Sequence, residues 1–350
     1  MTAEGKAAVR TTPRTAAPRT APPGTRRSLR GWGGVAGTAA AVALTAALLP
    51  GLAGDVRQDH PAAAGDRAAG GAVAAQPAKS AKAGQEECET PEASLRPSAN
   101  ATGDGVQRII DRGRLIAGID QNSYRWGYRN PLTGKLEGFD IDLARAIAGE
   151  ILGDESKVTF RSIPTSERIT ALKEKQVDIV VRTMTINCER IEEVAFSTEY
   201  FTGDQAVLAP AGSDITGFDE SLKGKRVCTA EGSTGEGALE EGKYGAEVKL
   251  VPNQLDCLVR LQLGEADAVV TDNALAAGQA AQDPSTRLVG TLNRPEPYGV
   301  AMNIDHHDLV RRVNKLLEDY RQNGWQDAYQ KWLAKDMPGI DGPPAPKYKD

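Results

Sequence analysis

Arg190 and Thr185 are the residues best suited to hold an anion. The Arg190 guanidinium is a planar fork that can bind a carboxylate through two parallel hydrogen bonds. Thr185 lies five residues earlier, on the expected turn into a helix, where its hydroxyl and nearby N–H groups can add to an anion site. A solvated surface position is the alternative for Arg190, because most arginines are exposed. The pair favours a carboxylate site.

A second set of polar groups opens another expected helix. Ser233 and Thr234 follow Gly232 after a strand, and their hydroxyls and the free N–H groups of the helix can bind a carboxylate or an amide. A plain helix cap is the equally open alternative.

The common catalytic motifs are missing from the sequence. It contains no Gly-rich loop ending in Lys-Ser or Lys-Thr, no HExxH and no GxSxG. The three histidines, His60, His306 and His307, are not spaced with the cysteines to complete a zinc site. We therefore expect no catalytic centre, no metal and no cofactor.

Short apolar strands alternate with amphipathic helices from Arg114 onward. Strands are expected at 114–119, 158–163, 178–181, 205–209, 226–229, 247–251, 268–271 and 298–302, and helices at 139–152, 166–175, 188–195, 234–241, 254–263, 273–281, 308–322 and 325–335. Repeated strand–helix units indicate mostly parallel sheets flanked by helices. Two such series, joined near Ala209 and near Tyr298, predict an α/β fold of two lobes crossed twice by the chain.

The two series also give the expected boundaries. Lobe 1 is expected over 106–208 and 300–336, and lobe 2 over 209–299. The last residues, 337–350, form a Pro-rich tail.

The first 105 residues differ in composition from the rest. Residues 1–54 join a basic stretch to an apolar, Ala-rich one, which is typical of a signal sequence or an N-terminal membrane anchor. Residues 55–105 are rich in Ala, Gly and Pro and are expected to form a disordered tether. The protein is thus expected outside the cytoplasmic membrane, secreted or tethered.

Charge and cysteine content bear on partners and stability. The net charge of -5 and the isoelectric point of about 5.5 argue against a nucleic-acid partner. An even number of cysteines in an exported protein predicts two disulfides, and the count alone leaves three pairings open.

Four segments carry a family resemblance. They are 138–144 (GFDIDLA), 171–178 (ALKEKQVD), 184–200 (MTINCER followed by AFSTEY) and 266–272 (ADAVVTD). In this order they resemble the polar amino-acid branch of the bacterial extracellular solute-binding proteins, over about 230 residues. The cysteine placement looks most like a glutamate-, aspartate- or glutamine-binding branch.

The resemblance implies a two-lobed periplasmic-binding-protein fold of type II with an amino acid between the lobes. Arg190 and Thr185 would hold the α-carboxylate, and Asp272 would accept from the α-ammonium. An ordinary helix N-cap is the alternative role for Asp272. Thr183 would add a further contact at a strand end.

The residues that select the ligand side chain are expected in several segments. Arg168 and Thr165 match an arginine and a hydroxyl of acidic-amino-acid binders, although Arg168 could instead form a surface salt bridge. Tyr124 and Trp126 lie in the first strand–helix loop, where the family often places an aromatic residue against the ligand. Arg182 and Gln254, Ser233 and Thr234 are further candidates.

The function that the resemblance implies is binding of glutamate or aspartate, or of glutamine or asparagine, by a monomer that delivers its ligand to the membrane permease of an ABC transporter. A sensing domain that signals to a membrane protein is one alternative. A dehydratase on the same fold is another, although no histidine or glutamate stands at a motif position to serve as a general acid or base.

The lobe assignment suggests the disulfide pairing. Cys228 and Cys257 both fall in lobe 2, on a strand and on the second helix after it, so we expect them to pair. Cys88 would then pair with Cys188 and fasten the N-terminal extension beside Arg190.

Overall fold

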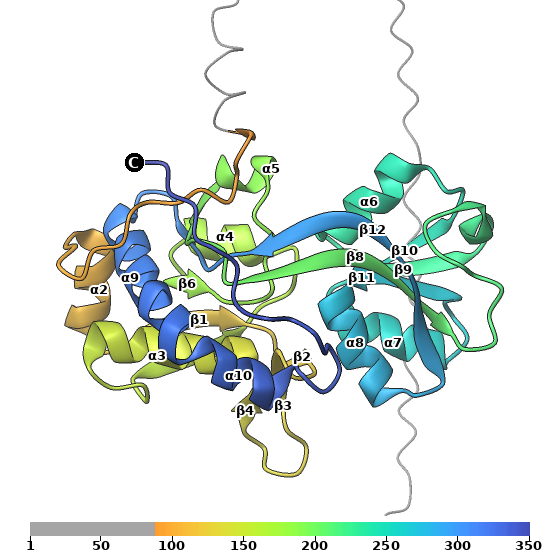
Figure 1. Cartoon of the computed structure of the whole chain (residues 1–350), viewed down its shortest axis with the longest axis horizontal. Coiled ribbons are helices and arrows are strands. Elements are labelled where there is room, and N and C mark those ends of the chain that lie inside the picture. Colours follow the sequence, from red (N-terminus) through yellow and green to blue (C-terminus); the bar gives the residue numbers. More distant parts are fainter. Residues whose placement is uncertain (1–87) are drawn as a thin grey trace, which may run out of the picture. The chain divides into compact units, whose positions relative to one another are not determined.

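The computed structural model describes residues 88–350 and contains two five-stranded sheets, each with its own helices (Figure 1). The α/β architecture of two lobes expected from the sequence is confirmed. Residues 1–87, which carry the expected signal segment and most of the expected tether, lie outside the described residues. Among residues 88–350, no helix is both long enough and apolar enough to cross a membrane.

The first sheet, which defines lobe 1, has the strand order β5-β1-β6-β13-β7. Its strands are β5 (Val158–Ser162), β1 (Leu115–Ile119), β6 (Ile179–Val180), β13 (Ala301–Asn303) and β7 (Val194–Phe196). The strands β5, β1 and β6 are parallel, whereas β13 runs antiparallel to both of its neighbours. The helices of this lobe are α2 (Asp104–Arg112), α3 (Phe139–Leu152), α4 (Arg168–Lys173), α5 (Cys188–Ile191), α9 (His307–Asn323) and α10 (Trp325–Trp332).

The second sheet, which defines lobe 2, has the order β10-β9-β11-β8-β12. Its strands are β10 (Glu247–Val251), β9 (Arg226–Ala230), β11 (Ala268–Asp272), β8 (Phe201–Pro210) and β12 (Thr286–Tyr298). The strands β10, β9 and β11 are parallel, and β8 is antiparallel to β11 and β12. A short 3-10 turn (Glu220–Leu222) and helices α6 (Thr234–Gly242), α7 (Gln254–Gln262) and α8 (Asn273–Gln282) complete the lobe.

Two long antiparallel strands, β8 and β12, join the lobes (Figure 1). Phe201 pairs with Tyr298, and Gly203 pairs with Glu296, at the ends nearest lobe 1. The sequence predicted only the tip of β12, as the start of a strand over 298–302. The structure instead has a thirteen-residue strand that ends at Tyr298 and a separate short strand after it. The prolines of β12 concealed it, and they are tolerated because β12 is an edge strand.

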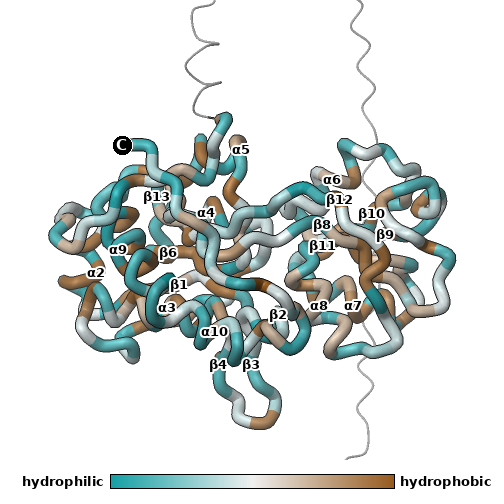
Figure 2. The backbone as a smooth tube through the Cα atoms, in the orientation of Figure 1, coloured by the Kyte–Doolittle hydropathy of each residue, from teal (hydrophilic) through white to brown (hydrophobic). Residues whose placement is uncertain are grey.

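The interior of each lobe is apolar, as the strand patterns predict. The helix α3 begins and ends where the sequence predicted it, and it buries Phe139, Leu143 and Ile147 completely. Figure 2 shows hydrophilic residues along the outer helix α9 and along the chain leading to the C-terminus. One assignment was wrong: Val194–Phe196 is the edge strand β7 and not the end of a helix, because α5 stops at Ile191.

The segment after Cys88 and the C-terminal segment lie against lobe 1. Ser94 is 3% exposed and forms an isolated β-bridge with Tyr348, and its hydroxyl donates to the Phe196 carbonyl. The Asn314 side chain donates to Ser94 Oγ and to the Leu95 carbonyl. The expected tether therefore ends before residue 105, because hydrogen bonds to distant elements hold residues whose own composition showed no packing signal.

The disulfides join the residues that the lobe assignment suggested. Cys88 is bonded to Cys188 and Cys228 to Cys257, with Cα–Cα distances of 5.3 and 5.4 Å. The first bond attaches the N-terminal segment to helix α5. The second joins strand β9 to helix α7 inside lobe 2.

Candidate ligand-binding site

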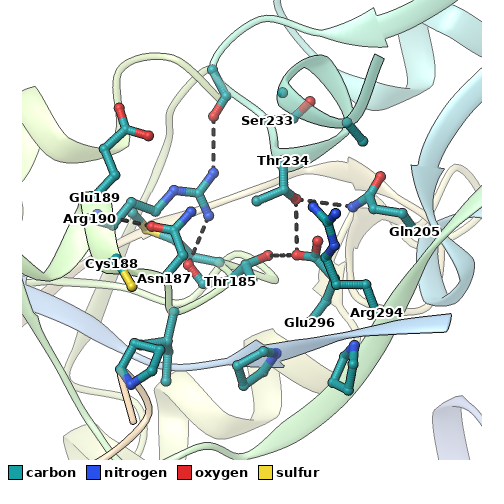
Figure 3. A pocket seen from close by; sticks show the side chains of 18 of the residues that line it. Thr185, Asn187, Cys188, Glu189, Arg190, Gln205, Ser233, Thr234, Arg294 and Glu296 are labelled. Carbon is teal, nitrogen blue, oxygen red and sulfur yellow. Dashed lines mark hydrogen bonds between the residues drawn. The ribbon is translucent and has the colours of Figure 1, made fainter. Parts of the chain in front are cut away.

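Ten of the predicted site residues surround one small cavity at the boundary of the lobes. The cavity measures about 20 Å³, and its lining comprises Thr165, Arg168, Arg182, Thr183, Thr185, Arg190, Ser233, Thr234, Gln254, Asp272 and Leu275. It shares six of these residues with a cleft of about 860 Å³ (Figure 3). The hydroxyl, guanidinium and carboxyl groups predicted from the sequence therefore lie together in one polar site.

Arg190 lies on the four-residue helix α5, whose start is fixed by Asn187. The Asn187 side chain accepts a hydrogen bond from the Arg190 backbone N–H at 2.9 Å and caps the helix. The guanidinium donates from Nη1 to the Thr185 carbonyl at 2.8 Å and from Nη2 to the Gly232 carbonyl at 3.1 Å. Arg190 is buried, which lowers its pKa, while the carboxylates of Glu296 and Asp272 act in the opposite direction.

Arg168 binds the same carbonyl from a second helix. Its Nη2 donates to the Gly232 carbonyl at 3.1 Å and its Nε donates to the Thr165 carbonyl at 2.8 Å. Burial, and then the charges of Arg190 and Arg182, lower the pKa of Arg168. Gly232 has a φ of +71°, and a Cβ there would lie 3.0 Å from the Ser166 Cα, so glycine suits this contact between the lobes.

Asp272 ends strand β11 and is buried. Gln205 Nε2 donates to its Oδ1, and the Tyr298 hydroxyl donates to its Oδ2, both at 2.6 Å. Asp272 occupies the N-cap position of helix α8, but its side chain makes no capping hydrogen bond there. Burial and then the Glu296 carboxylate raise the pKa of Asp272 to about 7.

Glu296, on strand β12, is a site residue that sequence reasoning missed. It is 4% exposed, and its Oε2 accepts from the Thr185 hydroxyl and, at 2.9 Å, from the Thr234 hydroxyl (Figure 3). The flanking prolines made this segment look unlike a strand. No local signal pointed to Glu296, because its neighbours in the site come from distant parts of the chain.

The hydroxyls at the start of α6 divide between the two roles considered. Ser233 is the N-cap, and its Oγ accepts from the Glu236 N–H at 3.2 Å, which is the plain capping role. Thr234 faces the cleft, where it accepts from Gln205 Nε2 at 3.0 Å and donates to Glu296.

Several buried polar atoms around the site lack a partner within residues 88–350. They include the Thr165 hydroxyl, Gln254 Oε1, Gln205 Oε1 and Arg182 Nε, on side chains no more than 5% exposed. Buried polar groups are normally hydrogen-bonded, so these atoms suit a polar ligand. Arg182 is paired with Asp120 at 3.3 Å, and Thr183 is held by its N–H, which donates to Asp140 Oδ2 at 3.0 Å.

Tyr124 and Trp126 are not brought into this cavity. Trp126 is 1% exposed, its Nε1 donates to the Ala274 carbonyl at 3.2 Å, and its ring contacts Phe139 and Phe201. Tyr124 lines a separate pocket with Trp126 and helix α8. Burial of the large Trp126 ring in the core is more favourable than its exposure in a cleft, so the ring packs inward.

Comparisons with known proteins identify the family to which the chain is similar. Residues 115–335 match the model of the bacterial extracellular solute-binding proteins, family 3. The chain is 35% identical over 234 residues to the ABC transporter glutamine-binding protein GlnH of Bacillus subtilis, covering 67% of this chain and 86% of that protein. It is 40% identical over 197 residues to a glutamine-binding protein of Geobacillus stearothermophilus, covering 56% and 74%. A solved ancestral arginine-binding protein bound to glutamine is similar in fold, with a TM-score of 0.60, 38% identity and coverage of 63% of this chain and 98% of that one.

Proposed function

The chain belongs to family 3 of the bacterial extracellular solute-binding proteins, and from that premise we propose that it captures a free amino acid with an amide or carboxylate side chain and delivers it, as a monomer, to the permease of an ABC transporter. Relatives named as glutamine-binding proteins, one of them of an ABC transporter, support both parts of this proposal. Their names describe binding proteins and not enzymes.

The observation that carries the proposal is the pairing of opposite charges across the cavity. Arg190 and Thr185 on lobe 1 supply donors for an α-carboxylate, and Asp272 on lobe 2 supplies an acceptor for an α-ammonium. Both ends of a free amino acid need a fixed partner when they leave water. A cavity that offers both, one from each lobe, fits the backbone atoms of an amino acid.

Binding requires movement between the lobes. A cavity of about 20 Å³ has room for a group of the size of a water molecule, which is far smaller than an amino acid. The contacts that close it run between lobes: the Gly232 carbonyl of lobe 2 accepts from Arg168 and Arg190 of lobe 1. We infer that these contacts part to admit the ligand and that strands β8 and β12 bend as the hinge. The ligand would then hold the lobes closed through contacts with both of them.

The α-carboxylate would take over the Thr185 hydroxyl. In the structure that hydroxyl donates to Glu296, and Arg190 donates to the Thr185 carbonyl, so the donors of the site are already satisfied by protein acceptors. A ligand carboxylate would replace Glu296 as the acceptor of this hydroxyl, and Glu296 would keep the hydrogen bond from Thr234.

A thermal-shift screen of the twenty amino acids on the purified full-length chain tests the proposal. We expect glutamine, glutamate, asparagine or aspartate to raise the melting temperature, since a ligand that binds only the folded state stabilises it by mass action. Apolar amino acids should raise it less. If none of the twenty changes the melting temperature, the proposed function is wrong.

A further inference from the structure

Glu296 occupies the point at which the two lobes and the hinge meet. Its strand, β12, is one of the two crossing strands, and its carboxylate accepts from Thr185 of lobe 1 and from Thr234 of lobe 2. No more than 4% of the residue is exposed, so the charge is shielded from bulk water. A buried charge interacts with neighbouring charges more strongly than a solvated one does.

The buried charges of the site balance only when Glu296 is counted. Arg182 is already paired with Asp120, which leaves Arg168 and Arg190 against Glu296 and the ionised form of Asp272, the form that pairs with an ammonium. An amino acid with an uncharged side chain adds one positive and one negative group and preserves this balance. A ligand with a second carboxylate adds a negative charge for which no cation is in surplus, and unpaired buried charge is costly.

The cleft that leads to the site also disfavours a ligand with an extra negative charge. Seven acidic side chains and four basic ones line it. Two of the basic residues are engaged outside the inner cavity, because Arg294 is bonded to Glu241 and Lys347 to Glu92. A cleft lined with an excess of one sign repels ligands of that sign and lowers their local concentration.

We propose that Glu296 sets the charge of the ligand that this site accepts, and makes it select an amide side chain over a carboxylate side chain. This inference rests on the proposed binding of an amino acid, and it names the substrate class within it. Arg168 acts in the opposite direction, because its positive charge favours an acidic side chain. Its guanidinium, however, already donates hydrogen bonds to the Thr165 and Gly232 carbonyls.

The charge of Glu296 also acts on the titration of Asp272. The groups that face Asp272 are Glu296 and Tyr298 from β12, Arg190 from α5 and, more weakly, Arg168 from α4. The Glu296 carboxylate raises the pKa of Asp272, so removing that charge should lower it. Since an ammonium binds the ionised form of Asp272, the pH at which binding weakens should move down with it.

The test is a calorimetric titration of the full-length chain with L-glutamine and with L-glutamate at pH 7.5. We expect the wild type to bind glutamine about tenfold more tightly than glutamate or better, and E296Q to reduce this ratio about fivefold or more. E296D keeps the charge and should keep the preference. E240Q removes an exposed acid of the same cleft and should change the ratio less than about twofold, because exposed charges are screened.

A second readout follows the pH. In E296Q the pH at which glutamine binding falls by half should be lower than in the wild type, a shift that loss of hydrogen bonding alone would not produce. If E296Q does not fold, E296S removes the same charge and is used in its place.

Two results would overturn the inference alone: a wild type that binds glutamate as tightly as glutamine, or a ratio that is the same in E296Q and the wild type. If none of glutamine, glutamate, asparagine and aspartate binds, the proposed function fails and the inference fails with it, so the two failures are distinguishable.

Discussion

The Tyr298 hydroxyl donates a hydrogen bond of 2.6 Å to Asp272 Oδ2, and this bond ties the end of hinge strand β12 to the proposed acceptor for the α-ammonium. Gly203, opposite Glu296 on β8, leaves room for the Tyr298 ring: a Cβ at Gly203 would lie 2.7 Å from the Tyr298 hydroxyl oxygen. The position of Asp272 is therefore coupled to the strands that bend when the lobes move. Ligand capture and hinge geometry share this contact.

The pH dependence of binding should follow Asp272. Its raised pKa, about 7, means that the carboxyl is partly protonated near neutrality, and only the ionised form pairs with an ammonium. Affinity for L-glutamine should therefore rise as the pH increases from 5.5 to 8, by up to about tenfold per pH unit below that pKa. Calorimetry across this range measures it, and a flat profile in the wild type would contradict the role of Asp272. The D272N variant should bind weakly, with a flat profile.

Arg190→Ala should weaken the binding of every amino acid by a similar factor. Removing the guanidinium leaves the α-carboxylate without its charged partner in a closed cleft, at a cost of about 2–5 kcal/mol. R129A, at an exposed arginine outside the site, is the matched control and should bind as the wild type does. Calorimetry with glutamine and glutamate checks both. An R190A protein that folds and binds either ligand with near wild-type affinity would refute the assignment.

Arg168→Met should distinguish the role of Arg168 in ligand selectivity from the role of Arg190 in general binding. Because Arg168 is the cation that favours a second carboxylate, its loss should weaken glutamate more than glutamine and raise the preference for the amide. Some loss with both ligands is also expected, since the bond to the Gly232 carbonyl between the lobes disappears. The glutamine-to-glutamate affinity ratio measures this. An unchanged ratio would remove Arg168 from the selectivity of the site.

The two disulfides should differ in their effect on binding. Each should stabilise the folded state by roughly 3–5 kcal/mol through the unfolded chain. The Cys88–Cys188 bond also holds α5, which carries Arg190, so C88S/C188S should lose affinity as well as stability. C228S/C257S, within lobe 2, should lose stability with affinity changed less than about twofold. Urea unfolding and calorimetry test both variants. Non-reducing peptide mapping that joined Cys88 to Cys228 would contradict the pairing.

Asp140 should make stability fall as the pH rises. Burial raises its pKa to about 7, so the folded protein holds a proton that the unfolded chain releases near pH 4. Its contribution to stability is full below about pH 4 and is lost as the pH increases towards 7. The D140N variant removes this titration. Urea unfolding of both proteins between pH 4.5 and 7.5 should show the wild type losing stability relative to D140N as the pH increases, and a constant difference would contradict it.

Local patterns were sufficient for the part of the site that lies on predicted elements. Arg190 lies on the short helix α5, Thr185 lies in the loop before it and Asp272 ends strand β11, where element order alone brings parts of the two lobes together. Glu296 could not be found in this way, because Pro295 and Pro297 concealed its strand and because its partners lie 111 and 62 residues away. The position of such a residue is decided by the register of long-range strand pairs.

Trp126 is the opposite case, a residue that the sequence placed in the site and that lies in the core. Its place in the first strand–helix loop favoured the cleft, but its ring lies against Phe201 and Tyr298, which the sequence places far away. A loop residue turns inward when aromatic rings from distant elements form a pocket for it, and no local pattern contains that information.

The central claim, that the cavity holds a free amino acid by both of its backbone charges, is tested most directly by calorimetry with three ligands on the full-length chain. L-glutamine should bind with one molecule per chain. N-acetyl-L-glutamine, which lacks the ammonium, and L-glutamine amide, which lacks the α-carboxylate, should each bind at least about a hundredfold more weakly, because each leaves a buried charge of Asp272 or Arg190 unpaired. Binding of either derivative with the affinity of glutamine, or no binding of glutamine and glutamate at all, would contradict the account.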